Sequence, residues 1–355
     1  MSNLFAFNDY NVTKIRTRFP SLTIKDDGAN RIYLDNPGGT QICQSSLDQI
    51  QNYFLRNNAN SGGTFRTSLE TDAVLLKTRV AMSEFLNAAT EKEIVFGQNM
   101  TSLTFAISHS LTQWVKPEHE IIVTRLDHDA NIAPWLQLSD ETGAKIRWVD
   151  FDPRDCTLNL KNFEKLLTNK TQLVAVGYAS NSVGTINPIK EIAAMAHSVG
   201  ALVFVDAVQY APHAPIDVQD IGADFLVCSP YKFFGPHQGV LWAKYELLDN
   251  LPAYKVRPTE NKPPHKFETG TQSHEGQAGT LGALEHIAWI GDEFGHYYAS
   301  QFSAMSHRRL HLHCGMAAIQ AYEQQLSAHL IEGLLKISKV RIWGITDKNR
   351  LNERV

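Results

Sequence analysis

The sequence predicts an α/β protein built on a mostly parallel sheet, and three observations lead to this fold class. Short, nearly continuous apolar runs alternate with amphipathic stretches through the middle of the chain. Such runs are typical of strands that helices cover on both faces. Polar residues directly follow several runs, and ligands of such sheets bind at the carboxyl ends of the strands. At 355 residues the chain exceeds what one core usually holds, so a second, smaller domain is expected.

Seven apolar runs are expected to form the strands. They are, in chain order, 93–96, 120–128, 145–152, 173–180, 201–209, 223–229 and 239–244. An amphipathic helix is expected from Thr101 to about Leu111. A second helix, IKEIAAMAHSVG, is expected to open after Pro188 and to stop at Gly200, which are the usual places of these two residue types.

The chain becomes helical after about residue 280, and VRIWGI (340–345) then predicts one more strand. A single strand with helices makes an incomplete layer. We therefore expect an N-terminal arm over residues 1–22 that packs on the small domain, and a large domain over 23–282. A small α/β domain over 283–355 is expected to be incomplete at its C-terminus.

Composition excludes several classes of function. Hydrophobic residues make up 43% and charged residues 20%, and a net charge of −4 gives no reason to expect nucleic acid or an anionic membrane as partner. No apolar run approaches the roughly 20 residues of a membrane-spanning helix, and the N-terminus lacks a signal-peptide pattern. The four scattered cysteines indicate neither zinc nor disulfides, so a reducing cytoplasm and no metal are expected.

Two polar residues at strand ends suggest covalent chemistry. Lys232, in SPYKFFGPHQG, follows the run 223–229 and has aromatic neighbours. An amine that loses hydration there has a lowered pKa and can form an imine, although a surface lysine is the alternative. Asp206 ends LVFVD, where a buried acid needs a cationic partner such as a protonated pyridine nitrogen, and Gln209 could reach the same ligand. The alternative for Asp206 is a helix N-cap.

Two further features follow earlier strands. Asn99 or Thr101 could cap a helix whose free N–H groups hold a phosphate, with ordinary capping as the alternative. His128, in DHDANIAPW, could stack on an aromatic ring, or it could be an ordinary loop histidine. Together the four features describe a ligand with a phosphate, a ring nitrogen, a flat face and an aldehyde. Pyridoxal 5′-phosphate (PLP) has all of them.

The motifs DHDAN, VDAVQ and SPYKFFGP, with YLDNPGGTQ (33–41), give the chain a resemblance to a known family. It resembles the cysteine desulfurase-like group of the class V aminotransferases, over nearly its whole length. The resemblance implies the PLP-dependent transferase fold of type I, with a mostly parallel seven-stranded sheet in the large domain. It also implies PLP as the cofactor and an amino acid as the substrate.

The resemblance also implies roles for individual residues. Lys232 matches the lysine that forms the aldimine with the cofactor, Asp206 the acid that keeps the pyridine nitrogen protonated, and His128 the ring-stacking histidine. The other residues implied to bind the cofactor are Met100, Thr101 and Ser229 at the phosphate, Gln209 and Asn181 near the ring hydroxyl, and Gly270 and Thr271, which resemble a loop that reaches the partner subunit's phosphate. A homodimer with composite sites follows. Asn36 and Arg66 are candidate substrate contacts, with a helix salt bridge as the alternative for Arg66.

Some departures from the family leave the reaction open. Desulfurases take sulfur on a mobile-loop cysteine late in the chain, and no cysteine here has that position. Cys228 falls inside a strand, and Cys43 alone could lie near the site. We favour a PLP enzyme that acts on an amino acid. A C–S lyase, an aminotransferase, an epimerase and a catalytically silent dimeric homologue remain alternatives, since the cofactor does not choose among them. A nucleotide-binding oxidoreductase is disfavoured, because such an enzyme needs a GxGxxG motif after an early strand and this sequence has none.

Overall fold

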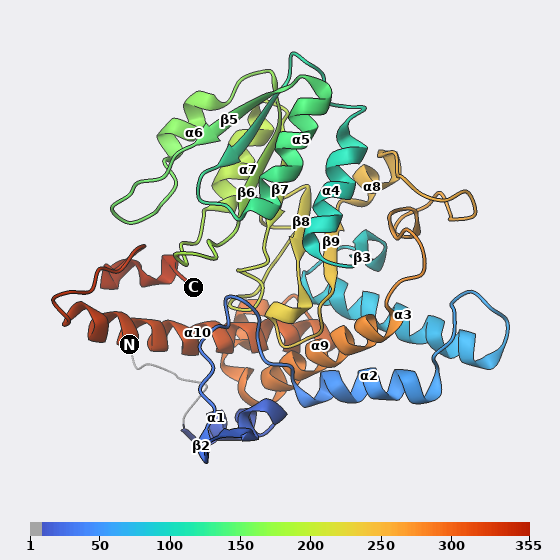
Figure 1. Cartoon of the computed structure of the whole chain (residues 1–355), viewed down its shortest axis with the longest axis vertical. Helices are drawn as coiled ribbons and strands as arrows, with labels where there is room; N and C mark the ends of the chain where they lie inside the picture. The colour runs from blue at the N-terminus through green and yellow to red at the C-terminus, as the bar shows by residue number, and fades with distance from the viewer. Residues whose placement is uncertain (1–8) are drawn as a thin grey trace.

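A seven-stranded sheet forms the centre of the protein (Figure 1). The computed structural model describes residues 9–355. The strand order is β3-β9-β8-β7-β6-β4-β5; all neighbours from β8 to β5 run parallel, and β9 runs antiparallel to both β3 and β8. The strands are β3 (Ile94–Gly97), β4 (Glu120–Thr124), β5 (Lys145–Val149), β6 (Thr171–Gly177), β7 (Leu202–Asp206), β8 (Phe225–Cys228) and β9 (Gly239–Ala243). The predicted mostly parallel, seven-stranded sheet is confirmed.

Helices cover both faces of the sheet, because side chains of each strand alternate between two apolar cores. In β7, Val203 and Val205 enter one core, while Phe204 enters the other, where its ring centroid lies 4.8 Å from that of Trp135. The Phe204 face is covered by α4 (Met100–Leu111), α5 (Ala133–Thr142) and α8 (Tyr245–Asn250). The opposite core includes α3 (Arg66–Phe85), α6 (Leu160–Leu166), α7 (Ile189–Ser198), α9 (His274–Phe294) and α10 (His307–Leu335).

The two helices expected within the sheet region are confirmed as α4 and α7. Pro188 immediately precedes α7, and Gly200, just after it, has φ +81°, a left-handed conformation that glycine adopts without strain. Several strands end earlier than the apolar runs suggested. β4 stops at Thr124, so the polar residues up to His128 lie in the loop that follows.

Long helices form a layer below the sheet in the view of Figure 1, where α9 lies beside α2 (Gln44–Arg56), α3 and α10. The contact between α9 and α10 is made at backbone distance, because a Cβ on Gly291 would lie 1.7 Å from the carbonyl oxygen of His311. A side chain at that position would push the two helices apart.

The described part of the N-terminal arm packs on α9. After α1 (Asp9–Arg16), the Arg18 guanidinium lies 4.0 Å from the ring centroid of Trp289, and its Nε donates a hydrogen bond to Nδ1 of His286 at 3.1 Å. Residues 1–8 of the predicted arm lie outside the described residues. Residue 282, the predicted end of the large domain, falls inside α9, and the domain boundaries stay a prediction.

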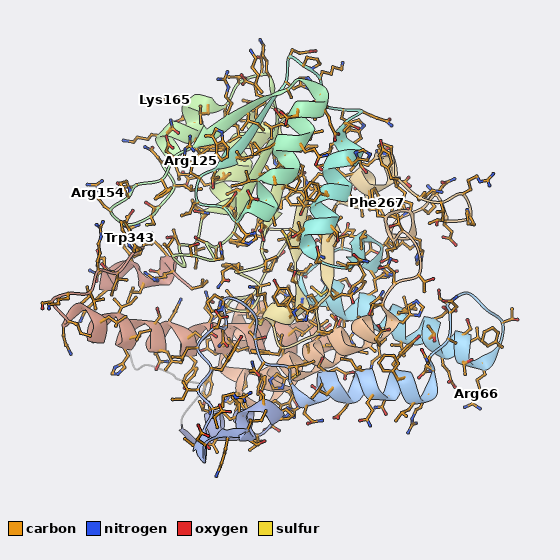
Figure 2. All side chains as sticks on the ribbon, viewed as in Figure 1. Arg66, Arg125, Arg154, Lys165, Phe267 and Trp343 are labelled. Carbon is orange, nitrogen blue, oxygen red and sulfur yellow. The ribbon has the colours of Figure 1, made fainter. Side chains whose placement is uncertain are left out.

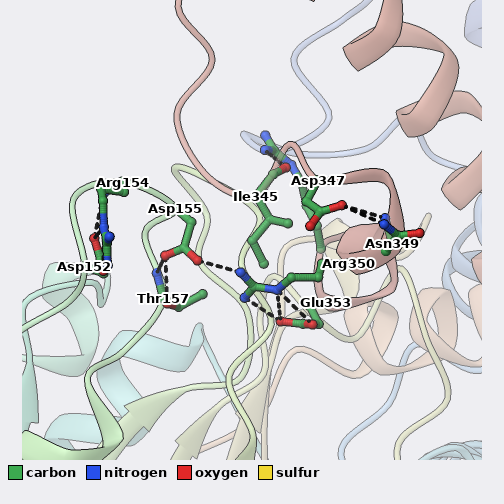
Figure 3. A network of polar contacts seen from close by, with 10 residues as sticks. Asp152, Arg154, Asp155, Thr157, Ile345, Asp347, Asn349, Arg350 and Glu353 are labelled. Carbon is green, nitrogen blue, oxygen red and sulfur yellow. Dashed lines mark hydrogen bonds and ion pairs between the residues drawn. The ribbon is translucent and has the colours of Figure 1, made fainter.

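The strand predicted at 340–345 is wrong, since these described residues form no strand. A strand forms only where a neighbouring strand pairs with it, and an apolar pattern does not show whether such a neighbour is present. The segment is instead held by Arg354, whose Nη1 donates to the carbonyl oxygens of Trp343 at 3.1 Å and Ile345 at 3.0 Å. Further along the chain, Arg350 donates to Asp155 at 2.7 Å and to Glu353 at 2.8 Å (Figure 3). Close to the end of the chain, Arg354 forms an isolated antiparallel bridge with Thr185, beyond β6.

Candidate active site

A cavity of about 390 Å³ lies where β4, β6 and β7 end and α4 begins. It brings seven of the predicted site residues together, namely Met100, Thr101, His128, Asn181, Asp206, Gln209 and Lys232. The remaining lining residues are Pro37, Gly38, Leu126, Asp127, Gly177, Ala179, Val208 and Tyr231. A larger cavity of about 780 Å³ opens beside the start of α10, but it contains none of the predicted site residues.

Lys232 is a buried lysine in the short turn Pro230–Lys232 that follows β8. Its side chain is 7% exposed, and its Nζ lies 5.1 Å from the ring centroid of Tyr231. The amine donates a hydrogen bond to the carbonyl oxygen of Pro37. Burial lowers the pKa of Lys232, while the charges of Asp206 and Asp35 act in the opposite direction. A larger fraction of this amine is therefore neutral and nucleophilic than of a solvated lysine.

Asp206 is the last residue of β7 and is 7% exposed. Its Oδ1 accepts a hydrogen bond from the N–H of Val208 at 2.9 Å, and residues 207–213 form turns rather than a helix that the acid could cap. Burial raises the pKa of Asp206 to about 6, against the opposing charges of His128 and Lys232. The carboxylate would thus gain from a cationic partner inside the cavity.

A second buried carboxyl group, Asp127, was not among the predicted site residues. It accepts a hydrogen bond from the N–H of Gly177 at 2.6 Å and another from the side chain of Asn131 at 3.3 Å. Burial raises the pKa of Asp127 well above its usual range, and the charge of Asp206 adds to the effect. The signal in the sequence was an acid just after the β4 run, the same kind of position that singled out Asp206.

The first turn of α4 borders the cavity. Asn99 caps the helix, because its Oδ1 accepts a hydrogen bond from the N–H of Ser102 at 2.8 Å. Met100 and Thr101 line the cavity in that first turn, where backbone N–H groups have no acceptor within the helix. His128 accepts a hydrogen bond at Nδ1 from the N–H of Ala130 at 3.0 Å, which leaves Nε2 as the ring nitrogen that can donate.

Two buried oxygens near the cavity have no hydrogen-bond partner within the described residues, Oε1 of Gln209 and Oγ of Ser229. Buried polar atoms are rarely left unpaired, so each indicates a missing partner. Gln209 lines the cavity and is 8% exposed, whereas Ser229 is fully buried and does not line it. Asn181 lies on the cavity wall in the exposed turn after β6.

Comparison with known proteins identifies the family. Residues 32–313 match the family Aminotransferase class-V. The chain belongs to that family. A probable cysteine desulfurase of Streptomyces coelicolor is 34% identical over 94% of this chain and 78% of its own length. One from Synechocystis is 32% identical over 94% and 77%. The solved apo cysteine desulfurase of Thermococcus onnurineus superposes with a TM-score of 0.82 at 25% identity, covering 96% of this chain and 80% of that one.

These similarities confirm the predicted family and fold, so the chain is a cysteine desulfurase-like enzyme of the class-V aminotransferases. The family also fits the cavity. Its chemistry depends on PLP, which uses a lysine and an acid of the kind that this cavity contains.

Besides Ser229, four predicted site residues of this class-V aminotransferase lie outside the cavity lining of their own chain. Arg66 begins α3 at the rim of the molecule (Figure 2), with a side chain that is 90% exposed and pairs with Glu70 at 2.8 Å. This pairing is the salt bridge that the sequence left open as an alternative. Gly270, at φ +70°, and Thr271 lie in the exposed loop before α9, and Asn36 lies in an exposed turn next to Pro37.

All four cysteines are buried and unpaired. Cys228 lies in β8 within the apolar core, and burial raises its pKa. Burial also raises the pKa of Cys43, whose sulfur approaches Ser45 Oγ at 3.4 Å. None of these thiols has the exposure of a reactive cysteine.

Within the described residues 9–355, no cluster of three or more histidine, cysteine or acidic side chains could hold a metal ion. No helix in this part of the class-V aminotransferase is long and apolar enough to cross a bilayer.

Proposed function

We propose that the chain binds PLP in this cavity and acts on an amino acid as a cysteine desulfurase-like enzyme. The observation that carries the proposal is the pairing, in one cavity, of the buried Lys232 amine with the buried Asp206 carboxyl group. The cavity volume of about 390 Å³ falls within the range of small-molecule sites. The side chain of Gln209, whose oxygen has no partner within the described residues, adds a polar group to the cavity wall.

In the proposed binding mode, each cavity residue contacts the part of PLP that suits its charge or shape. The first-turn N–H groups at Met100 and Thr101 would hold the phosphate, because a helix N-terminus favours an anion. The ring of His128 would stack on the flat face of the pyridine. Asn181 would lie near the ring hydroxyl, with Gln209. Ser229 is proposed as a further phosphate contact through its unpartnered hydroxyl group.

PLP, when bound, supplies an electron sink for a bond broken at the α-carbon of an amino acid. Asp206 holds the proton on the pyridine nitrogen, because a buried carboxylate favours an adjacent cation. The amine of Lys232 would accept the proton from the α-carbon of the substrate in its neutral form and return a proton in its protonated form, and its lowered pKa suits this exchange. Burial of both groups limits competition from water.

The buried thiols favour a second candidate. Desulfuration by way of a protein persulfide needs an exposed thiolate, and all four cysteines of this chain are buried. A C–S lyase, an aminotransferase or an epimerase on the same cofactor needs no thiol. These reactions are therefore the second candidate for the same cavity.

We also propose a homodimer whose sites are shared between subunits. Gly270 and Thr271 would complete the phosphate site of the partner subunit, and their exposure in the loop before α9 is compatible with this role. Exposed large apolar side chains occur in the extended segment 31–35, on α2 and at the start of α3, and they suit an interface: Ile32, Leu34, Phe54, Leu55, Phe65 and Leu69. Asn36 and Arg66 stay predictions as substrate contacts. The four free thiols suit a reducing compartment, so the cytoplasm is the proposed location.

A screen of amino acids tests the proposal. The protein is saturated with PLP, and each amino acid is followed for sulfide, alanine, pyruvate, keto acid and inverted stereochemistry, with Lys232→Ala as the control. Turnover of cysteine to alanine with release of sulfur supports desulfuration, whereas pyruvate with sulfide supports a C–S lyase. A PLP absorption band that no amino acid perturbs would contradict an enzymatic role and support a catalytically silent homologue.

A further inference from the structure

The carboxyl group of Asp127 ties the loop that carries His128 to the end of β6. Its Oδ1 accepts a hydrogen bond from the N–H of Gly177 at 2.6 Å, and its Oδ2 accepts one from the side-chain amide of Asn131 at 3.3 Å. Asp127 and Gly177 both line the cavity, and Gly177 pairs with Asp206 in the sheet. We infer that Asp127 is a positioning residue, which holds the ring of His128 where it can stack on the bound ligand.

Gly177 allows the carboxyl group to come this close to the backbone of β6. A Cβ on Gly177 would lie 2.6 Å from Oδ1 of Asp127, so a side chain there would push the loop away. The carbonyl oxygen of Gly177 accepts in turn from the side-chain N–H of Asn187 at 2.7 Å. Side chains from two different loops thus bind both backbone polar groups of the last residue of β6, at the wall of the cavity.

The direction of each hydrogen bond in this network follows from its innermost member. The indole Nε1–H of Trp135 can only donate, and Nε1 lies 3.1 Å from Oδ1 of Asn131. The amide of Asn131 therefore presents its NH2 group to Asp127, whose two oxygens both accept. Trp135 and Asn131 are fully buried, so water does not replace either partner.

His128 lies between two fixed points of the loop. Asp127, just before it, is bound to β6, and Asn131, three residues after it, is bound to Trp135 of α5. Within the loop, Nδ1 of His128 accepts from the N–H of Ala130, which restrains rotation of the ring. A ring that stacks on a flat ligand has to be held closely in place by its supporting contacts. The inference rests on the proposed binding of PLP and gives that site a residue that acts through His128.

An exchange of two polar groups separates positioning from charge. In Asp127→Asn alone, the new NH2 group meets the NH2 group of Asn131, and two donors face each other. When Asp127→Asn is combined with Asn131→Asp, the carboxylate at position 131 accepts from both Trp135 and residue 127, and the Gly177 N–H keeps an acceptor. Shape and net charge are retained, but the carboxylate leaves the cavity wall, because position 131 does not line it.

The test is the affinity of the cofactor-free protein for PLP, measured by titration of absorbance, with the visible circular dichroism of the bound PLP. Asp127→Asn and Asn131→Asp are each expected to weaken binding about tenfold and to reduce the dichroism. The double variant should bind within about threefold of the unchanged protein and recover its dichroism. The matched control is Asp129→Asn, which removes an exposed carboxylate from the same loop and should bind like the unchanged protein.

A second background shows whether the effect passes through His128. In His128→Ala, adding Asp127→Asn should cause no further loss of affinity, since the two residues act as one unit. Should Asn131→Asp alone fail to fold, because its carboxylate faces that of Asp127, the comparison of Asp127→Asn with the double variant still gives the answer.

The inference is overturned if Asp127→Asn binds PLP as Asp129→Asn does, or if its loss adds to that of His128→Ala. It is also overturned if the double variant binds no better than Asp127→Asn, which would assign the effect to charge at the cavity wall. A wild-type protein that binds no PLP would contradict the proposed function, and this inference with it. Wild-type binding with unchanged variants would contradict the inference alone.

Discussion

Replacing Asp206 with asparagine is expected to stabilise the cofactor-free protein while it disables the site. The carboxylate of Asp206 is buried, and the pKa of the group rises from 3.8 to about 6 on folding. That rise corresponds to about 3 kcal/mol of folding free energy lost when the folded group is ionised. Asparagine keeps an oxygen that can accept from the Val208 N–H and carries no charge, so it removes most of this cost.

The sign of the effect follows from the two pKa values. At pH 4 the folded carboxyl group is still protonated and the unfolded one is about half ionised, so the two proteins should differ by less than about 1 kcal/mol. Between 3.8 and about 6 the unfolded chain ionises while the folded protein keeps its proton, so the wild type loses stability as pH rises. Above that range the full advantage of Asp206→Asn, about 3 kcal/mol, is expected.

Urea unfolding of the two cofactor-free proteins between pH 4 and 8 measures this difference. Asp224→Asn is a matched control, because Asp224 is also buried but accepts from Lys244 at 2.6 Å and from the Val203 N–H at 2.8 Å. Its loss should destabilise the protein at neutral pH, opposite to the expected effect at Asp206. The reasoning is refuted if Asp206→Asn is the less stable protein at pH 8, or if its advantage does not change with pH.

Three further predictions concern the framework around the site. Arg79→Leu should cost about 3–5 kcal/mol in urea unfolding, because it strands the buried carboxylate of Glu268, which Arg79 holds at 2.8 and 3.0 Å; a cost below about 1 kcal/mol would contradict this. Gly291→Ala should lower the midpoint of thermal unfolding, since its Cβ would clash with the carbonyl oxygen of His311 and separate α9 from α10. An unchanged midpoint would contradict a tight contact between the two helices. Because all four thiols are buried, none should react with a thiol reagent until the protein unfolds, and rapid labelling of the native protein would reveal an exposed cysteine.

The sheet and the centre of the site could be predicted because their signals are local. Apart from the edge strand β5, each strand is an apolar run, because a strand buried on both faces needs apolar side chains on both. Lys232 and Asp206 stood out as polar residues at the ends of such runs, where parallel strands direct their ends to one edge. Asp127 is also an acid just after an apolar run, but the motif that contains it was interpreted through its neighbour, His128.

The features that the sequence did not reveal depend on contacts between distant segments. Nothing local connects His213 with Glu323, which only the packing of α10 against the turns after β7 brings together. The segment 340–345 has the composition of a strand, but its state depends on whether a neighbour is there to pair with it. Ser229 also follows the β8 run, but its side chain is fully buried and does not line the cavity.

The most direct test of the central claim is to locate the amine that reacts with PLP. The protein is incubated with PLP, reduced with borohydride and digested, and its lysine-containing peptides are weighed by mass spectrometry. We expect the pyridoxyl group on Lys232 before any other lysine, and no such labelling in the Lys232→Ala variant. Label spread evenly over surface lysines, with Lys232 unmodified, would contradict the account.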